Sequence, residues 1–349
     1  MNEKNDFQNI LNKIKKEKFP ENIQITVYSK NKTVIRENLG KPYKYFDVSS
    51  LTKIMVTTPL IMKLVNDKKL NLNDRLEKYL GFLQGRAPGQ IKIIDLLRHK
   101  SGLEWWRPYF KELMKCPVTS RVAVLKKIFA AEKVGRSEKC VYSDLDFILL
   151  GWVIEEILSL SLDEAAHEYI FKPLKMGNTR FLRCEFGKKS QFAPTGNDKR
   201  RGYICGEVDD DNCWAMGGVS GHAGLFSTMD DTLKFAVSIW NAYNGKSNKI
   251  FNAKLVKKFA QRSVSQSIGD WALGFMVPSR PVSTAGTKVS SNAFGHVGYT
   301  GTSIWIDVKR KAIVTVLANG SYPNRDNTRF GKLRKQLHDA IWELLDEQK

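Results

Sequence analysis

The sequence predicts an α/β fold of the α+β type, in which helices flank an antiparallel sheet and a mainly helical subdomain is added. Runs with strand character lie near both ends of the chain, and segments with helical spacing of apolar residues dominate between them. No internal repeat or low-complexity linker interrupts this order. We therefore expect residues 23–67 and 232–349 to form one α/β domain, residues 68–231 to form a mainly helical insert with ordered loops, and residues 1–22 to form an N-terminal lead-in.

The N-terminal half begins with a predicted hairpin and continues with helices. Residues 23–28 and 33–37 are rich in β-branched side chains on either side of the polar residues 29–32. Residues 51–65 then carry apolar side chains at helical spacing. Further helical patterns follow at residues 76–80, 91–99, 122–131 and 144–160.

The C-terminal half is predicted to return to strands after a region of loops. Residues 192–229 are rich in Gly, Asp and Asn, which favours ordered loops, and residues 231–243 have a helical pattern. An amphipathic helix at residues 328–345 closes the chain. Strands are predicted at residues 271–277, 302–307 and 313–317.

Composition and charge limit the classes of partner. Apolar residues make up 42% of the chain and charged residues 26%, as in ordinary globular proteins. The net charge of +20 is compatible with nucleic-acid binding, but the basic residues are dispersed and match no nucleic-acid module, so we expect no such partner. The N-terminus has no apolar signal segment, and no run of 18 apolar residues occurs. We therefore expect a cytoplasmic protein without a membrane span.

The five cysteines predict free thiols rather than a metal site. None belongs to a C-x-x-C pair, and no Cys/His cluster has the spacing of zinc ligands. An odd, scattered set in a chain of this length is typical of a reducing compartment. We therefore expect no structural metal and no disulfide framework. The cysteines are Cys116, Cys140, Cys184, Cys205 and Cys213.

The first motif with catalytic meaning is Ser50-Leu51-Thr52-Lys53. Ser50 falls at the predicted start of a helix, so Lys53 lies on the same face one turn later. The positive end of the helix and burial would both lower the pKa of the Lys53 amine. A serine hydroxyl is a poor nucleophile without a base, and a neutral amine could accept its proton. Taken alone, the tetrapeptide is more simply explained by an N-capping Ser50 and an exposed Lys53.

Two later segments complete the candidate site. Tyr142-Ser143-Asp144 comes just before a predicted helix, where the tyrosine could relay a proton, although a capping residue beside a packed aromatic would look the same. Residues 295–302 are rich in glycine and lead into a strand, which lets a ligand backbone approach closely. There the backbone N–H of Tyr299 could join that of Ser50 in an oxyanion hole. A plain glycine-rich turn is the alternative.

The three segments together follow the order S-x-x-K, Y-x-[ND], [KH]-x-G, which is similar to the signature of β-lactamases and penicillin-binding proteins. The sequence resembles the branch with tyrosine in the second motif. This branch comprises class C β-lactamases, D-alanyl-D-alanine carboxypeptidases and family VIII esterases. The resemblance extends from about residue 23 to the C-terminal helix, and further matching segments are 96–103, 149–151, 173–176 and 218–228.

This resemblance implies a fold like that of β-lactamases and DD-peptidases, and a serine hydrolase activity. Ser50 would attack a carbonyl and form an acyl-enzyme, Lys53 and Tyr142 would move the protons, and water would deacylate without a cofactor or metal ion. The expected substrate is an ester or a peptide-like amide, such as a D-alanyl peptide or a muropeptide. The sequence leaves the oligomeric state open.

The sequence departs from the antibiotic-degrading pattern at two positions. His296 replaces the lysine of the third motif and, with an ordinary pKa of about 6.5, is largely neutral at pH 7. Asp144 replaces the commoner asparagine and would favour the ammonium form of Lys53. We therefore expect Asp144, His296 and Gly298 to bind the substrate, and β-lactamase activity to be weak.

Two other functions are compatible with the sequence. A non-catalytic scaffold or ligand sensor with the same fold would show slow acylation without turnover. Nucleic-acid binding driven by the net charge would show a salt-dependent shift with nucleic acid. His222 either lies near the site or orders its loop. Trp105, Trp106 and Tyr109 either line a substrate cleft or form a packed aromatic cluster.

Overall fold

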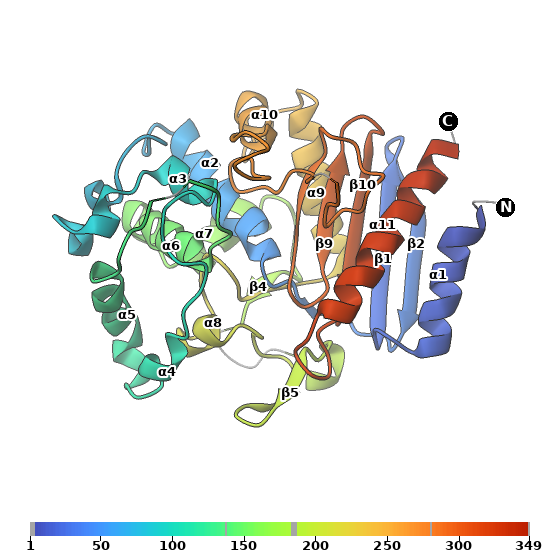
Figure 1. Cartoon of the computed structure of the whole chain (residues 1–349), viewed down its shortest axis with the longest axis horizontal. Coiled ribbons are helices and arrows are strands. Elements are labelled where there is room, and N and C mark those ends of the chain that lie inside the picture. Colours follow the sequence, from blue (N-terminus) through green and yellow to red (C-terminus); the bar gives the residue numbers. More distant parts are fainter. Residues whose placement is uncertain (1–3, 137, 183–186, 280, 348–349) are drawn as a thin grey trace.

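A five-stranded antiparallel sheet joins the two ends of the chain (Figure 1). The computed structural model describes residues 4–136, 138–182, 187–279 and 281–347. The strands lie in the order β2-β1-β10-β9-β8, so that the first hairpin pairs with the last strands through β1 and β10. Their bounds are β1 Asn22–Ser29, β2 Lys32–Gly40, β8 Phe294–Val297, β9 Ser303–Asp307 and β10 Ala312–Ala318.

Alternation along the strands explains why helices cover both faces of this sheet. In β10, Ile313 and Leu317 belong to the main apolar core, whereas Val314 and Val316 belong to a second core on the other face. The covering helices are α1 Lys4–Glu17, α9 Met229–Tyr243 and α11 Thr328–Glu347. The first and last of these pack on the second core, and α9 packs on the main core (Figure 1). β8 is left as an edge strand.

Several of the other helices pack against α6 (Asp144–Leu158), in which residues 145–154 are all buried. Such a helix is apolar on every side because other elements surround it. Its neighbours include η1 and α2, which follow Ser50 along the chain. The remaining helices and turns are η1 Lys53–Thr57, α2 Thr58–Asn66, η2 Leu76–Lys78, η3 Gly81–Leu83, η4 Ala87–Gln90, α3 Ile93–Leu97, α4 Phe110–Leu113, η5 Val118–Ser120, α5 Arg121–Ala130, α7 Leu162–Ala166, η6 His167–Phe171, η7 Lys189–Gln191, α8 Asp211–Ala215 and α10 Ala253–Ala260.

Two small sheets connect the helical part to the main sheet. The order of the first is β3-β7-β4, and it brings the segment just before Ser50 beside the segment after His222. The second is a two-stranded hairpin of β5 and β6. Their bounds are β3 Phe46–Asp47, β4 Arg180–Phe181, β5 Gly196–Asp198, β6 Gly202–Ile204 and β7 Leu225–Ser227.

The structure confirms the predicted fold class and most predicted elements, and it corrects two of them. The lead-in contains the helix α1, which agrees with the prediction of a lead-in there. The first correction concerns residues 76–80, which form only the short turn η2. The strand predicted at residues 271–277 is wrong, because the segment is a tight turn with isolated bridges from Met276 to Trp271 and Gly295. Gly274 has φ +84°, and a Cβ there would lie 2.1 Å from Thr58 Oγ1. The chain therefore turns here against α2 and does not extend. The division of the chain at residues 67/68 and 231/232 remains a prediction.

Two predictions from composition concern thiols and membrane spans. Cys116, Cys140, Cys205 and Cys213 are free thiols, and Cys184 lies outside the described residues. Within the described ranges, no helix combines the length and the apolar character that crossing a membrane requires.

Candidate active site

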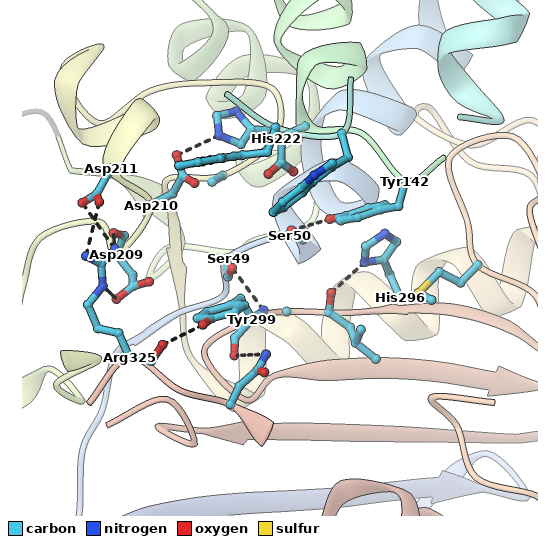
Figure 2. Close-up of a pocket in the computed structure, with 18 of the residues that line it drawn as sticks. Ser49, Ser50, Tyr142, Asp209, Asp210, Asp211, His222, His296, Tyr299 and Arg325 are labelled. Carbon is cyan, nitrogen blue, oxygen red and sulfur yellow. Dashed lines mark hydrogen bonds and ion pairs between the residues drawn. The ribbon is translucent and has the colours of Figure 1, made fainter. Parts of the chain in front are cut away.

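A cavity of about 790 Å³ lies where the edge strand β8 meets the beginnings of η1 and α6. Three segments that are far apart in the sequence therefore supply its walls, together with the loops at residues 198–223 and 324–327 (Figure 2). Of the predicted site residues, it is lined by Ser50, Tyr142, Asp144, His296, Gly298 and Tyr299. Trp105, Trp106 and His222 also line it.

Ser50 lies between β3 and η1, at the entry to a buried helical segment. The preceding residue, Ser49, has φ +51°, a conformation that side-chain-bearing residues rarely adopt. Its N–H donates to Asp47 Oδ1 at 2.8 Å, which holds this bend in place. The Ser50 hydroxyl oxygen then accepts from Lys53 Nζ at 3.0 Å and from the Tyr142 hydroxyl at 2.7 Å. The structure thus brings together the three residues expected to carry catalysis.

The Lys53 side chain is fully buried, and all three N–H groups of its ammonium have acceptors. Besides Ser50, these are Asp144 Oδ1 at 2.7 Å and the His222 carbonyl at 3.2 Å. Burial acts to lower the pKa of Lys53, but the charge of Asp144 and the contact with Tyr142 outweigh it and raise that pKa. The sequence-based expectation of a lowered pKa and a neutral amine is therefore wrong for the free protein.

Tyr142 and Asp144 are positioned by the start of α6. Ser143 is the N-cap, and its hydroxyl accepts from the Asp146 N–H at 3.4 Å. The Tyr142 ring stacks on Trp271, with centroids 5.5 Å apart and an interplanar angle of 7°. Burial raises the pKa of the Tyr142 phenol, so its hydroxyl keeps its proton and donates to Ser50.

The end of β8 supplies the third predicted segment. His296 is buried, and its Nδ1–H donates to the Val297 carbonyl at 2.8 Å. Burial, aided by the Lys53 charge, lowers the pKa of His296 to about 3, so the imidazole is neutral. A Cβ at Gly298 would lie 2.1 Å from Thr302 Oγ1, so only glycine fits there. The Tyr299 N–H donates at 3.2 Å to the Oγ of Ser49, the residue before Ser50.

The opposite wall of the cavity consists of residues that the sequence analysis did not single out as site residues. We call Asp198, Asp209, Asp210, Asp211 and Arg325 the acidic wall, and Figure 2 shows Asp209, Asp211 and Arg325 across the pocket from Tyr142 and His296. Arg325 pairs with Asp198 Oδ2 at 2.6 Å, Asp209 Oδ1 at 3.3 Å and Asp211 Oδ1 at 3.3 Å. In the sequence, the feature that could have indicated the acidic wall is the run of three aspartates at 209–211, in a chain with net charge +20.

Asp210 links the acidic wall to His222, whose carbonyl accepts from Lys53. Its Oδ1 lies 2.9 Å from His222 Nε2 and accepts from the Cys213 N–H at 2.7 Å. Burial acts to raise the pKa of Asp210, but His222 and these hydrogen bonds outweigh it and lower that pKa to about 2. Because the His222 carbonyl holds Lys53, His222 both orders its loop and belongs to the site.

Asp144, Asp210 and His222 also offer atoms within 4.8 Å of one another, a spacing that could hold a metal ion. The Lys53 ammonium already bonds Asp144 at 2.7 Å, and His222 already bonds Asp210. A cation bound there would compete with Lys53, so these donors fit the ammonium better than a metal ion. The expectation of a reaction without cofactor or metal remains a prediction.

Comparisons with known proteins agree with this fold and site. The family model "Beta-lactamase" matches residues 19–338. A protein of Salmonella heidelberg, provisionally named a D-alanyl-D-alanine carboxypeptidase, is 31% identical over 301 residues, which are 78% of this chain and 69% of that protein. These matches define the class of the protein as a β-lactamase-related serine hydrolase. The chain belongs to the β-lactamase family, as the motifs predicted.

Solved structures share the whole fold at low identity. EstCE1, described as a hydrolase with promiscuous acyltransferase activity, has a TM-score of 0.74 and 17% identity, covering 97% of this chain and 98% of its own. A class C β-lactamase from Rhodobacter sphaeroides has a TM-score of 0.72 and 17% identity, covering 98% and 99%. At this identity the likeness shows the fold alone.

Proposed function

We propose that the protein hydrolyses an ester or a peptide-like amide through an acyl-enzyme on Ser50. The observation that supports this most directly is the contact of Ser50 Oγ with both Lys53 Nζ and the Tyr142 hydroxyl inside one cavity. A serine at the start of a helix, with two proton-carrying groups at 3.0 and 2.7 Å, is arranged for nucleophilic attack on a carbonyl. The provisional name of the Salmonella relative favours D-alanyl peptides, including muropeptides, and the esterase-like fold neighbour keeps esters as the other class.

The proposed reaction has two balanced steps. The Ser50 oxygen bonds to the carbonyl carbon, the bond to the leaving group breaks, and the serine proton reaches the leaving group through Lys53 or Tyr142. Water then attacks the acyl carbon, which releases the acid and returns the proton to Ser50. The amides of Ser50 and Tyr299 would stabilise the oxyanion in both steps, once the substrate carbonyl displaces Ser49 Oγ from the Tyr299 N–H.

Before substrate binds, Lys53 and Tyr142 are both protonated, and one of these protons must leave before either group can accept the proton of Ser50. Lys53 is an ammonium and Tyr142 a neutral phenol, so both donate to Ser50 and neither can accept its proton. Loss of a proton from this pair therefore precedes acylation, and we expect the rate of acylation to rise with pH. Asp144, His296 and Gly298 would contact the substrate beside the reacting carbonyl.

Labelling with a fluorophosphonate probe tests this proposal. The wild type and Ser49→Ala should be labelled, and Ser50→Ala should not, because only Ser50 contacts both Lys53 and Tyr142. Ser49→Ala is the matched control, since it removes the neighbouring hydroxyl. Equal labelling of Ser50→Ala, or no labelling of the wild type, would count against the assignment.

A substrate panel then separates the proposed classes. Purified protein would be assayed with p-nitrophenyl esters, a chromogenic cephalosporin and D-alanyl peptides beside Ser50→Ala. We expect turnover of an ester or peptide and weak turnover of the cephalosporin, because neutral His296 offers no charge to its carboxylate. Labelling of Ser50 without turnover of any substrate would instead favour the ligand sensor.

A further inference from the structure

A buried histidine that the proposed reaction does not use contacts the chain on both sides of Tyr142. His99 lies just after α3, and its side chain is fully buried. Its carbonyl accepts from the Val141 N–H at 2.9 Å, and its Nδ1 accepts from the Ser143 N–H at 3.1 Å. The His99 ring also makes a T-shaped contact with the Tyr142 ring, with centroids 5.0 Å apart and an interplanar angle of 64°. His99 therefore fixes the backbone directly before and directly after Tyr142 and packs on the ring between them.

These contacts determine where the Tyr142 hydroxyl lies. Stacking on Trp271 restrains the plane of the Tyr142 ring, and the two His99 hydrogen bonds restrain the backbone from which the ring projects. His99 itself has φ +54°, an uncommon conformation that persists where the surrounding contacts enforce it. The phenol oxygen is at the far end of its side chain, so a small rotation of this backbone moves it away from Ser50 Oγ, which lies 2.7 Å away.

A buried carboxyl group on α6 determines which nitrogen of His99 carries the proton. Asp146 Oδ2 lies 3.2 Å from His99 Nδ1, and both side chains are fully buried. Nδ1 accepts from the Ser143 N–H only when the ring proton is on Nε2, so Asp146 bonds to the same nitrogen as a carboxylic acid that donates its proton. Burial raises the pKa of Asp146 well above its usual range and outweighs the Ser101 hydrogen bond and the Lys53 charge. Burial also lowers the pKa of His99 well below its usual range, so both groups are neutral.

We propose that His99 is a positioning residue for the reaction, which holds the Tyr142 hydroxyl on Ser50 while Asp146, as a neutral carboxylic acid, keeps the His99 proton on Nε2. This inference rests on the proposed function of Ser50. At Nε2, no hydrogen-bond partner is found among the described residues, so the contacts at Nδ1 decide the tautomer. An ionised Asp146 would draw the ring proton to Nδ1, and the Ser143 N–H would then lose its acceptor. One side of the Tyr142 backbone would be released.

Nitrogen-15 NMR of the histidines tests the tautomer without relying on turnover. The chain has five histidines, and comparison with the spectrum of His99→Asn assigns the His99 signals. At pH 7 we expect a proton on Nε2 and none on Nδ1. Asp146→Asn should keep this tautomer, because its amide N–H donates to Nδ1 as the carboxylic acid does. A proton on Nδ1 in the wild type, with or without one on Nε2, would overturn the proposal.

A double-mutant cycle separates positioning of Tyr142 from a purely structural role of His99. The rate of fluorophosphonate labelling of Ser50 would be measured in the wild type, His99→Phe, Tyr142→Phe and the double variant. His99→Phe keeps an aromatic ring but loses the acceptor, and we expect it to slow labelling on the order of 100-fold, as a misplacement of about 1 Å does. In the Tyr142→Phe background no phenol is left to position, so the same change should cost less than about threefold. Strain that phenylalanine adds at φ +54° acts in both backgrounds. The same loss in both, or no loss in either, would overturn the proposal.

Two variants of Asp146 provide a matched pair for the same assay. Asp146→Asn keeps a donor opposite Nδ1 and should be labelled at nearly the wild-type rate. Asp146→Leu has a similar volume but no donor, and we expect labelling at least about tenfold slower, because a buried hydrogen bond loses one partner. Circular dichroism checks that both variants fold. Equal rates in Asp146→Asn and Asp146→Leu would contradict the role of the neutral acid. These outcomes overturn the inference while wild-type Ser50 is still labelled, whereas an unlabelled wild type counts against the proposed function, so the two failures are distinguishable.

Discussion

The two walls of the cavity both carry ion pairs but use them differently. On the side of Ser50, Lys53 and Tyr142 donate to the Ser50 hydroxyl, and Asp144 accepts from the Lys53 ammonium. On the acidic wall, three of the four aspartates pair with Arg325, which joins loops more than a hundred residues apart in the sequence. The charges beside Ser50 determine which of the surrounding groups carries a proton. The charges of the acidic wall form ion pairs that hold separate loops together.

Removing the cation beside Ser50 should have the largest effect. Lys53→Met leaves Ser50 without its amine partner and Asp144 without its counter-ion. We expect the turnover number for a p-nitrophenyl ester to fall at least about 1,000-fold, as when other serine hydrolases lose a triad member. Steady-state kinetics measures this loss, and circular dichroism checks the fold. Lys63→Met, on α2 and away from Ser50, removes an ammonium that pairs with Asp67 and lies over the Tyr169 ring, and it should keep wild-type turnover. Similar losses in both variants would mean that general destabilisation, and not the site, explains the effect.

Removing the carboxylate beside Lys53 should move the pH dependence. Asp144 raises the pKa of Lys53, so Asp144→Asn lowers it and provides a neutral amine at lower pH. We expect the rising limb of kcat/KM against pH to shift by about one to three units toward acid. Asp198→Asn removes the same charge from the other wall and should leave the limb in place. If the rising limb of kcat/KM against pH is unchanged in Asp144→Asn, the titration of Lys53 does not set that limb.

Each motif beside Ser50 was predictable from the sequence because its geometry is local, and the resemblance to β-lactamases indicated that the motifs share one site. Ser50 and Lys53 lie one helical turn apart, and Tyr142 and Asp144 flank the N-cap Ser143 of a strongly apolar helix. Short motifs of this kind keep their residues together in any fold that forms the helices. The β1–β2 hairpin was predicted for the same reason, since a short turn sets its pairing.

The remaining features depend on contacts that no local pattern encodes. Arg325 meets Asp209 across more than a hundred residues, and Arg334 reaches the carbonyls of Gly298 and Thr302 only after α11 packs on the sheet. The raised pKa of Lys53 depends on the distance to Asp144, which the folded chain alone sets. The turn at residues 271–277 follows from Gly274 meeting Thr58, whereas its apolar sequence favours a strand.

Removing the Arg325 guanidinium from the acidic wall should affect the free energy of unfolding more than it affects kcat. Arg325→Gln leaves Asp209 buried without its guanidinium, and burial already raises the pKa of that carboxyl. We expect the free energy of unfolding to fall by about 2 kcal/mol, with kcat changed less than tenfold. Urea unfolding and ester kinetics measure the two quantities. A loss of kcat as large as that of Lys53→Met, with unchanged stability, would place the acidic wall in the chemistry itself.

The smallest effect is expected when only one of the Arg325 ion pairs is removed. Asp198 is partly exposed and accepts from Arg325 at 2.6 Å, while Arg325 keeps Asp209 and Asp211 as partners. Asp198→Asn should therefore cost about 1 kcal/mol of unfolding free energy or less, because a partly solvated pair contributes little and the guanidinium stays compensated. Urea unfolding beside Arg325→Gln gives the ratio of the two losses. Equal losses would mean that the ion pair with Asp198 accounts for all of the stabilisation by Arg325. The pairs with Asp209 and Asp211 would then contribute none.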